Sequence, residues 1–245
     1  DDFWSKSGLL DIEPFQRGSV PSDDGEYINT MNRFRGASGI VGVWASQNTR
    51  EQIFKALVRK ETFATSGPRM KIKFEAVGSN LTDLTSSQGD PSNGPVAMGG
   101  SFRTTDEKSP RFIISALQDP IGAPLERLQI IKGWVKNGQK VEAVFDIACS
   151  PETRQGKTAN CDNAAPMGER LDCSVGKGSA QFSLTWEDPS FDSTRDAFYY
   201  VRALEVPTCR WSTWDAIRAG VEPNPELPLK IQERAWSSPI WYEAL

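Results

Sequence analysis

The chain contains no histidine among its 245 residues. Histidine is the only side chain whose unperturbed pKa lies near neutrality, and it is the commonest metal ligand. Its absence excludes a Ser-His-Asp triad, a Cys-His pair and a His-rich zinc or iron site within this chain. Any chemistry that the chain performs by itself is therefore limited to carboxylate, lysine, tyrosine or thiolate groups.

Long hydrophobic runs and an excess of one charge are also missing. Because no stretch reaches the roughly 18 apolar residues that a transmembrane helix requires, the sequence predicts no membrane span. The 28 basic and 32 acidic residues are interspersed and give a net charge of −4, which argues against nucleic-acid binding. The chain starts at Asp1 without a methionine or a signal peptide, so we expect it to be a processed or truncated product.

The cysteines include no C-x-x-C pair, and no histidine is present to complete a zinc site. An even number of cysteines around a loop-like stretch, residues 150–165, favours two disulfides and an oxidising compartment. Reduced structural thiols and an all-cysteine metal site are the alternatives. Four cysteines allow three pairings, and the spacing does not choose among them. The residues concerned are Cys149, Cys161, Cys173 and Cys209.

A strand, a helix and a second strand are indicated early in the chain. The apolar run at 40–45 is typical of a buried strand, and 63–65 of a short one. Residues 48–60 predict a helix, because Thr49 and Gln52 form a capping box. One such unit cannot bury itself, so something else must cover it. The apolar positions that share one face of the helix are Ile53, Phe54, Leu57 and Val58.

From residue 70 onward, apolar and polar residues alternate with a period of two, as in strands with one solvent-facing side. Short segments of this kind, separated by turn-rich spacers, predict an antiparallel β-sandwich over 70–206. An Asn-Gly pair at 137–138 is the strongest local hairpin signal. The predicted strands are 70–75, 111–117, 128–135, 141–147, 180–186 and 197–204.

The end of the chain, 207–245, is predicted to be an irregular tail that wraps onto the main body. A short helix at 214–219 would end at Gly220, and the proline-rich stretch 221–229 would be extended. Four of the eight tryptophans lie in this tail, and so much aromatic surface needs burial against the rest of the chain. These four are Trp211, Trp214, Trp236 and Trp241.

Distinctive sequence blocks are spread along the chain: GVWA (42–45), NTRE (48–51), FATSGPR (63–69), MGG (98–100), QIIKGW (129–134), AFYYVR (197–202), CRWSTW (209–214) and QERAWSSPIWY (232–242). Together they resemble the C-terminal part of a large bacterial family known as domain of unknown function 3604. The resemblance covers nearly all of residues 37–242. The chain departs from the family pattern at 96–101, which weakens any functional role for that loop.

Members of that family often carry secretion signals and resemble metal-dependent hydrolases of the PHP (polymerase and histidinol phosphatase) superfamily. Their His- and Asp-rich metal motifs lie in an N-terminal half built on a distorted (β/α) barrel, and none of those motifs is present here. The resemblance implies that residues 1–69 are the C-terminal end of such a PHP-like α/β barrel. Residues 70–206 would then be an accessory β-sandwich, and 207–245 a Trp- and Pro-rich wrapping tail.

The expected fold class is therefore mainly β: an antiparallel β-sandwich preceded by a strand-helix-strand remnant of the barrel and followed by the irregular tail. Candidate substrate-contact residues lie at loops and turns. Arg69 follows a Gly-Pro turn, where a guanidinium could bind a phosphate or carboxylate, or simply tie the barrel to the sandwich. Asn48 and Arg50 could line a barrel mouth, although helix capping already explains Asn48. Arg210 could stack on its neighbour Trp211 or serve as a structural anchor.

Acidic pairs give no sign of a catalytic site. Glu187 and Asp188 precede Pro189, and nothing around them predicts a raised pKa, so we expect solvated turn residues. The chain itself is expected to hold no cofactor and no catalytic residue, and a divalent metal such as zinc would belong to the missing N-terminal half.

Two functions remain open from the sequence. The leading hypothesis is the C-terminal portion of a secreted or periplasmic PHP-like metal-dependent hydrolase, inactive alone, with the N-terminal half as partner and a small-molecule ester or phosphoester as substrate. The alternative is a β-sandwich module at the cell surface that binds carbohydrate or protein. Trp236 is the residue whose replacement would separate glycan binding from structural docking. A purely structural half that stays bound to its N-terminal partner is a third possibility.

Overall fold

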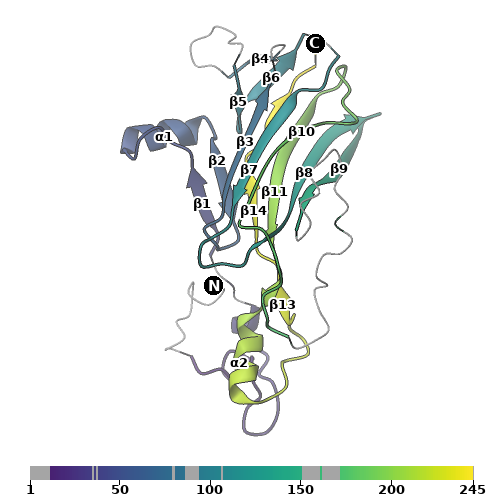
Figure 1. Ribbon diagram of the computed structural model, residues 1–245. Coiled ribbons are helices and arrows are strands. Elements are labelled where there is room, and N and C mark those ends of the chain that lie inside the picture. The colour runs from purple at the N-terminus through teal and green to yellow at the C-terminus, as the bar shows by residue number, and fades with distance from the viewer. Residues whose placement is uncertain are drawn as a thin grey trace.

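The computed structural model describes residues 12–34, 36, 38–78, 81–85, 94–105, 107–150, 161 and 172–244. Two mainly antiparallel layers dominate this part of the chain, and a small lobe lies below them (Figure 1). The smaller layer has the order β10 (Gln181–Glu187), β7 (Arg111–Leu117), β3 (Lys71–Val77) and β5 (Val96–Ala97). The larger layer contains β1 (Ile40–Val43), β2 (Thr62–Thr65), β14 (Arg234–Ser237), β11 (Ala197–Glu205), β15 (Ile240–Tyr242), β6 (Ser101–Thr104), β4 (Leu81–Asp83), β8 (Leu125–Lys136) and β9 (Gln139–Cys149).

The core lies between the two layers, and the alternation of the strands places it there. In β3, β7 and β10, every second side chain is buried while its neighbours face solvent. Aromatic rings from both layers meet in the middle: Phe112 lies 5.4 Å from Phe74 in its own sheet and 4.8 Å from Tyr199 in the other, measured between ring centroids. The six predicted sandwich strands are confirmed, as is the hairpin between β8 and β9, where Asn137 and Gly138 adopt φ values of 52° and 76°.

The larger sheet forks along one edge of β11. The first half of this strand pairs with β15 and the second half with β14, while β8 follows its other edge. β14 continues the sheet toward β2 and β1, whereas β15 pairs in parallel with β6, which leads to β4. The branches diverge at Ser238 and Pro239, where Ser238 N donates to Thr62 O at 2.9 Å and Gly99 N to Pro239 O at 2.8 Å.

The final segment of the chain corrects one expectation. It packs on the main body, but not as an irregular tail, because β14 and β15 are strands of the large sheet. Their side chains alternate between buried and more exposed positions, as in RAWS at 234–237, and the proline between them falls where the sheet forks. The predicted short helix is α2 (Trp211–Ala219), which begins earlier than expected and ends at Gly220 in the left-handed conformation.

The expected strand-helix-strand unit is present as β1, α1 (Arg50–Val58) and β2, but its strands are antiparallel neighbours. Ile40 pairs with Thr65 and Val43 with Thr62, so the unit is a hairpin whose connection contains a helix. Consecutive strands of a (β/α) barrel are parallel. The arrangement therefore differs from a barrel unit, and through β2 and β14 it belongs to the same sheet as the sandwich strands.

A small lobe forms where residues 12–34, with a short 3-10 helix (Met31–Phe34), fold against α2 and the ribbon of β12 (Thr208–Cys209) and β13 (Lys230–Ile231). Arg17 forms a buried ion pair with Asp215 at 2.9 Å, and Asn224 Nδ2 donates to Gly18 O at 2.8 Å. Within the described residues, no helix is both long and apolar enough to cross a membrane.

Two disulfides are present, as the sequence predicted, and the structure settles the pairing that the spacing left open. Cys149 at the end of β9 is bonded to Cys161, and Cys173 is bonded to Cys209 of β12. The second bond attaches the small lobe to the segment that precedes β10. No described cysteine is left as a free thiol.

Asp188 contradicts the expectation of a solvated turn residue. Its side chain is fully buried, and its Oδ2 atom lies 2.5 Å from Lys132 Nζ. The turn after β10 folds the carboxylate inward between the two sheets, where Tyr199 also donates a hydrogen bond to it at 2.8 Å.

Candidate functional site

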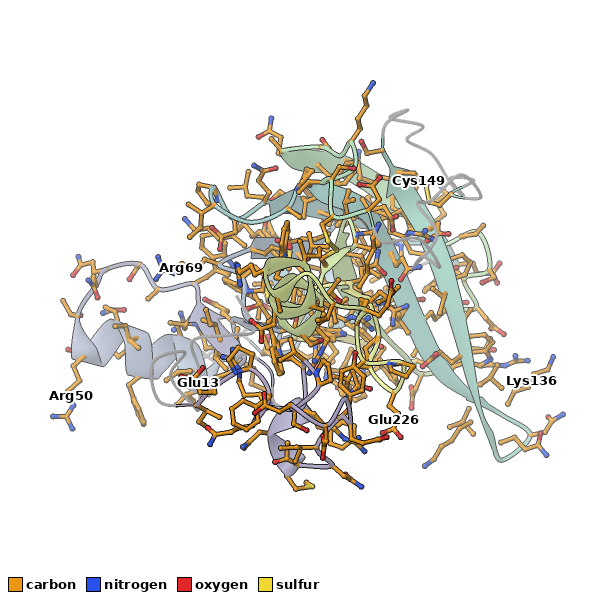
Figure 2. The ribbon with its side chains drawn as sticks, turned by 90° about the horizontal axis from the view of Figure 1, so that it is seen from below. Glu13, Arg50, Arg69, Lys136, Cys149 and Glu226 are labelled. Carbon is orange, nitrogen blue, oxygen red and sulfur yellow. A yellow bond between two sulfur atoms is a disulfide. The ribbon has the colours of Figure 1, made fainter. Side chains whose placement is uncertain are left out.

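The four predicted substrate-contact residues do not form one site. Arg69 follows the end of β2, whereas Asn48 and Arg50 follow the end of β1. Because β1 and β2 are antiparallel, these two ends lie at opposite ends of the ladder, and a shared barrel mouth would require them to be parallel. Figure 2 shows Arg50 at the outer tip of α1, and Arg69 does not lie beside it.

The N-terminal end of α1 is explained by helix capping. Thr49 adopts an extended conformation and its hydroxyl accepts a hydrogen bond from Gln52 N at 3.3 Å, which confirms Thr49 as the cap. The reciprocal half of the predicted capping box does not form, because Thr49 N donates to Gln47 O and Gln52 Oε1 accepts from Ser46 Oγ. Glu51 pairs with Lys55 one turn later, with side chains that remain 71% and 53% exposed. Asn48 and Arg50 are exposed beside this cap.

Arg69 lies on a turn that is pinned to the body by its backbone. Its N–H donates to Asp119 Oδ2 at 2.7 Å, while the arginine side chain is exposed. The start of the same turn is held from the other side, because Ser66 N donates to Arg234 O at 2.9 Å and Ser66 Oγ donates to Glu233. The exposed guanidinium therefore projects from a turn whose backbone is held at both ends.

Below this turn lies a buried group of carboxylates that the sequence did not single out. Asp119, Glu126 and Glu205 are 2%, 4% and 2% exposed. Burial, together with the charges of Glu233 and Asp119, raises the pKa of Glu205 to about 8. The three acidic residues lie in the loop before β8, in β8 itself and at the end of β11, so no local sequence pattern identifies them as a group. Among the described residues, no group of three or more acidic or cysteine side chains has the geometry to hold a metal ion.

Arg210 makes internal contacts within the small lobe. Its guanidinium is buried, with Nη1 donating to Ser212 Oγ and Nη2 to Arg33 O, both at 2.8 Å. The same group lies 4.6 Å from the ring centroid of Trp211, and Arg17 approaches that ring at 5.5 Å. Two arginines on one indole join the N-terminal segment to α2.

The apolar side of α1 forms a group of exposed hydrophobic residues. Phe54, Leu57 and Val58 are 65%, 46% and 63% exposed, and Ala56 is the one buried residue of the helix. The helix projects beside β1, an edge strand of the described sheet, whose Val41 is 69% exposed (Figure 1). We call these four residues the α1–β1 face. The sequence predicted an apolar helix face within a unit that something else must cover. Of its four residues Ile53 is half-buried, and the other three stay largely exposed to the described part of the chain.

Fold and site together define a disulfide-bonded, mainly antiparallel β-sandwich with an uncovered apolar helix at one edge and no metal-binding cluster in the described residues. The chain belongs to the DUF3604 family, described as a protein of unknown function, whose model matches residues 1–244. No curated protein and no solved structure gives a significant match.

Proposed function

We propose that this chain is the C-terminal accessory part of a larger PHP-like metal-dependent hydrolase, and that its α1–β1 face packs against the catalytic part that precedes it. The exposed apolar side of α1 carries this proposal. The metal, a divalent ion such as zinc, would be bound in the preceding part and would activate water for attack on an ester or phosphoester. The chain's own contribution is to dock there and to stabilise that part.

The energetics of the α1–β1 face favour a covered state. Fully burying a Val, Leu or Phe side chain gains about 1.5–3 kcal/mol relative to leaving it exposed. The side chains of the α1–β1 face are between 46% and 69% exposed. Covering each of them would therefore gain roughly half of that free energy or more. β1 adds an edge whose backbone groups can accept a further strand. Both features suit a permanent neighbour better than solvent.

The candidate arginines and Asn48 take separate roles in this proposal. Arg50 lies at the outer tip of α1 (Figure 2), and Asn48 is two residues before it, so both would meet the docked catalytic part. Arg69, held through its backbone by Asp119, would present its guanidinium to an anionic group of the substrate or of the partner. Arg210 would remain an anchor of the small lobe, since its hydrogen bonds are internal.

The domain division follows from the same proposal. Residues 1–69 would lead from the catalytic part into the sandwich of 70–206, and 207–245 would complete both the lobe and the sheet. The two disulfides fit an oxidising, periplasmic or secreted location.

The docking claim is tested with the separately produced catalytic part and the present chain. Wild-type chain should bind it, and Phe54→Asp or Val58→Asp should weaken binding at least about tenfold, a loss of about 1.4 kcal/mol or more. The matched control is Val144→Asp, another exposed apolar residue, 46% accessible on β9 at the edge of the large sheet opposite β1 (Figure 1). Isothermal titration calorimetry measures the affinities, and unfolding curves should show that all three variants remain folded.

Two results would contradict the proposal. The first is a catalytic part that binds Phe54→Asp as tightly as wild type, or does not bind the chain at all. The second is turnover of a generic phosphoester, such as p-nitrophenyl phosphate, by the isolated chain loaded with zinc, since the proposal leaves it inactive alone.

A further inference from the structure

A groove of about 920 Å³ lies on the solvent-facing side of the large sheet, in the branch formed by β6, β15, β11, β8 and β9. This volume falls at the upper end of the roughly 300–1,000 Å³ typical of small-molecule sites. Lys60, just after α1, borders the groove, but none of the four residues of the α1–β1 face lines it. It is therefore a separate surface from the docking face proposed above.

The floor of the groove is aromatic. Phe198 of β11 and Trp241 of β15 are neighbours, with ring centroids 5.2 Å apart and ring planes inclined by 50°, and Trp241 remains 46% exposed. Tyr200, two residues along β11, continues the aromatic surface beyond the groove, because its ring is within 11° of parallel to Phe198 at 6.4 Å. Exposed rings of this kind can stack on a flat, partly apolar ligand.

A glycine makes room for the Phe198 ring in this floor. Gly133 of β8 is the strand partner of Phe198, and a Cβ atom there would lie 2.3–2.4 Å from two atoms of the Phe198 ring. The ring therefore leans across the sheet into the space above Gly133 instead of standing upright. Any side chain at position 133 would displace the ring and disturb the floor.

The rim is strongly polar but electrically balanced. Three cations, Lys60, Lys140 and Arg195, face three anions, Glu142, Asp196 and Glu243, around the groove. Donors and acceptors are therefore both available at the edge of the rings, with no net charge to select an ion. A polyanion such as nucleic acid would require an excess of cations, and the groove has none.

We propose that this groove binds a neutral oligosaccharide. A pyranose ring has one face of C–H groups, which can stack on Trp241 and Phe198, and a periphery of hydroxyls, which both donate and accept hydrogen bonds. The charged side chains of the rim supply the complementary acceptors and donors, and their balance suits an uncharged sugar. The volume of about 920 Å³ accommodates a short chain of sugars better than a single one.

The test titrates the full chain with neutral oligosaccharides of different linkage, such as cellohexaose, maltohexaose, xylohexaose and chitohexaose, by calorimetry and tryptophan fluorescence. At least one should bind, and Trp241→Ala should weaken that binding at least about tenfold, or about 1.4 kcal/mol. Trp214→Ala is the matched control, because Trp214 is 39% exposed on α2 and does not line the groove. Glu142→Gln, a change at an exposed rim position, should also weaken binding without altering the unfolding curve.

Several outcomes would overturn the proposal. No binding by any of these sugars at millimolar concentration would do so, as would equal affinities of Trp241→Ala and wild type, with both folded. Binding restricted to anionic oligosaccharides would contradict the role of the balanced rim. A displayed peptide library that yields Trp241-dependent binders, while no oligosaccharide binds, would assign the groove to a protein partner instead.

Discussion

A buried ion pair joins the two sheets of the sandwich. Lys132 Nζ on β8 of the large sheet lies 2.5 Å from Oδ2 of Asp188, which directly follows β10 of the small sheet, and the two side chains are 5% and 0% exposed. Tyr199 donates to the same carboxylate oxygen at 2.8 Å, and Ser190 N donates to Oδ1 at 2.8 Å. The ammonium is satisfied as well, since it also donates to Ser190 O at 2.8 Å.

Replacing Lys132 with methionine should strongly destabilise the fold. Methionine retains an unbranched apolar side chain but removes the ammonium, so the Asp188 carboxylate stays buried without its cation. Breaking a buried pair in this way costs about 3–5 kcal/mol. For a protein of this size, each kcal/mol lowers Tm by about 2–4 °C, so we expect a fall of about 6–20 °C. Urea unfolding at neutral pH, followed by tryptophan fluorescence, gives the free energy directly.

A double-mutant cycle tests the cause of this loss. Lys132→Met combined with Asp188→Asn removes both charges, and it should cost clearly less than the sum of the single changes, because no buried charge is left alone. Lys55→Met is the matched control: its ion pair with Glu51 is exposed, and such pairs contribute about 0.2–1 kcal/mol. The reasoning is refuted if Lys132→Met costs less than about 1 kcal/mol, or if the two single changes are additive.

Two further predictions concern the buried carboxylates and the disulfides. Because burial raises the pKa of Glu205 from 4.5 to about 8, the unfolded chain releases this proton at lower pH than the folded chain, and stability should fall as pH rises through that interval. Glu205→Gln should flatten the Tm profile between pH 5 and 8, and an unchanged profile would refute the assignment. Replacing Cys173 and Cys209 with serine opens a span of 36 residues and should cost about 4 kcal/mol, against about 3 kcal/mol for the 12-residue span of Cys149 and Cys161, both measured by urea unfolding.

Local patterns predicted the strands, the hairpin and the helix cap, because each depends on residues close together in the sequence. The alternation in β3 and β7 fixes which side chains are buried, and Asn137-Gly138 fixes a turn between two adjacent strands. Thr49 and Gln52 likewise act within one helical turn. The strands and the hairpin are present as predicted, whereas only the Thr49 half of the predicted capping box forms.

Long-range pairing could not be predicted in the same way. Asp188 looked like a turn residue beside a proline, and its partner Lys132 lies 56 residues away. The sequence signal for this pair lay at Lys132. This lysine stands in the apolar run LQIIKGW of a buried strand, and a buried ammonium group needs an acidic partner. A charged residue inside an apolar strand pattern is therefore more informative than an acidic pair in a turn.

In the candidate site, too, local features were predictable and long-range contacts were not. Composition and spacing found the capped helix and its apolar side, but the direction of β2 relative to β1 depends on which strand each pairs with. That direction separates Arg69 from Asn48 and Arg50. The groove floor could not be read from the sequence either, since Phe198, Gly133 and Trp241 come together only through the pairing of β11 with β8 and β15.

The way α1 is attached to the sheet explains why its apolar side stays exposed to the described part of the chain. Gly99 adopts a φ of 92°, and a Cβ there would lie 2.5 Å from the carbonyl oxygens of Arg59 and Lys60, so the end of the helix fits closely into the fork of the sheet. Ala56 is fully buried, and its carbonyl accepts a hydrogen bond from Glu61 N at 3.1 Å. With its C-terminal end held there, α1 cannot roll over to cover Phe54 and Val58 with its own sandwich. The C-terminal end of α1 thus sets the orientation of the α1–β1 face, and the partner that we propose would lose little entropy in ordering it.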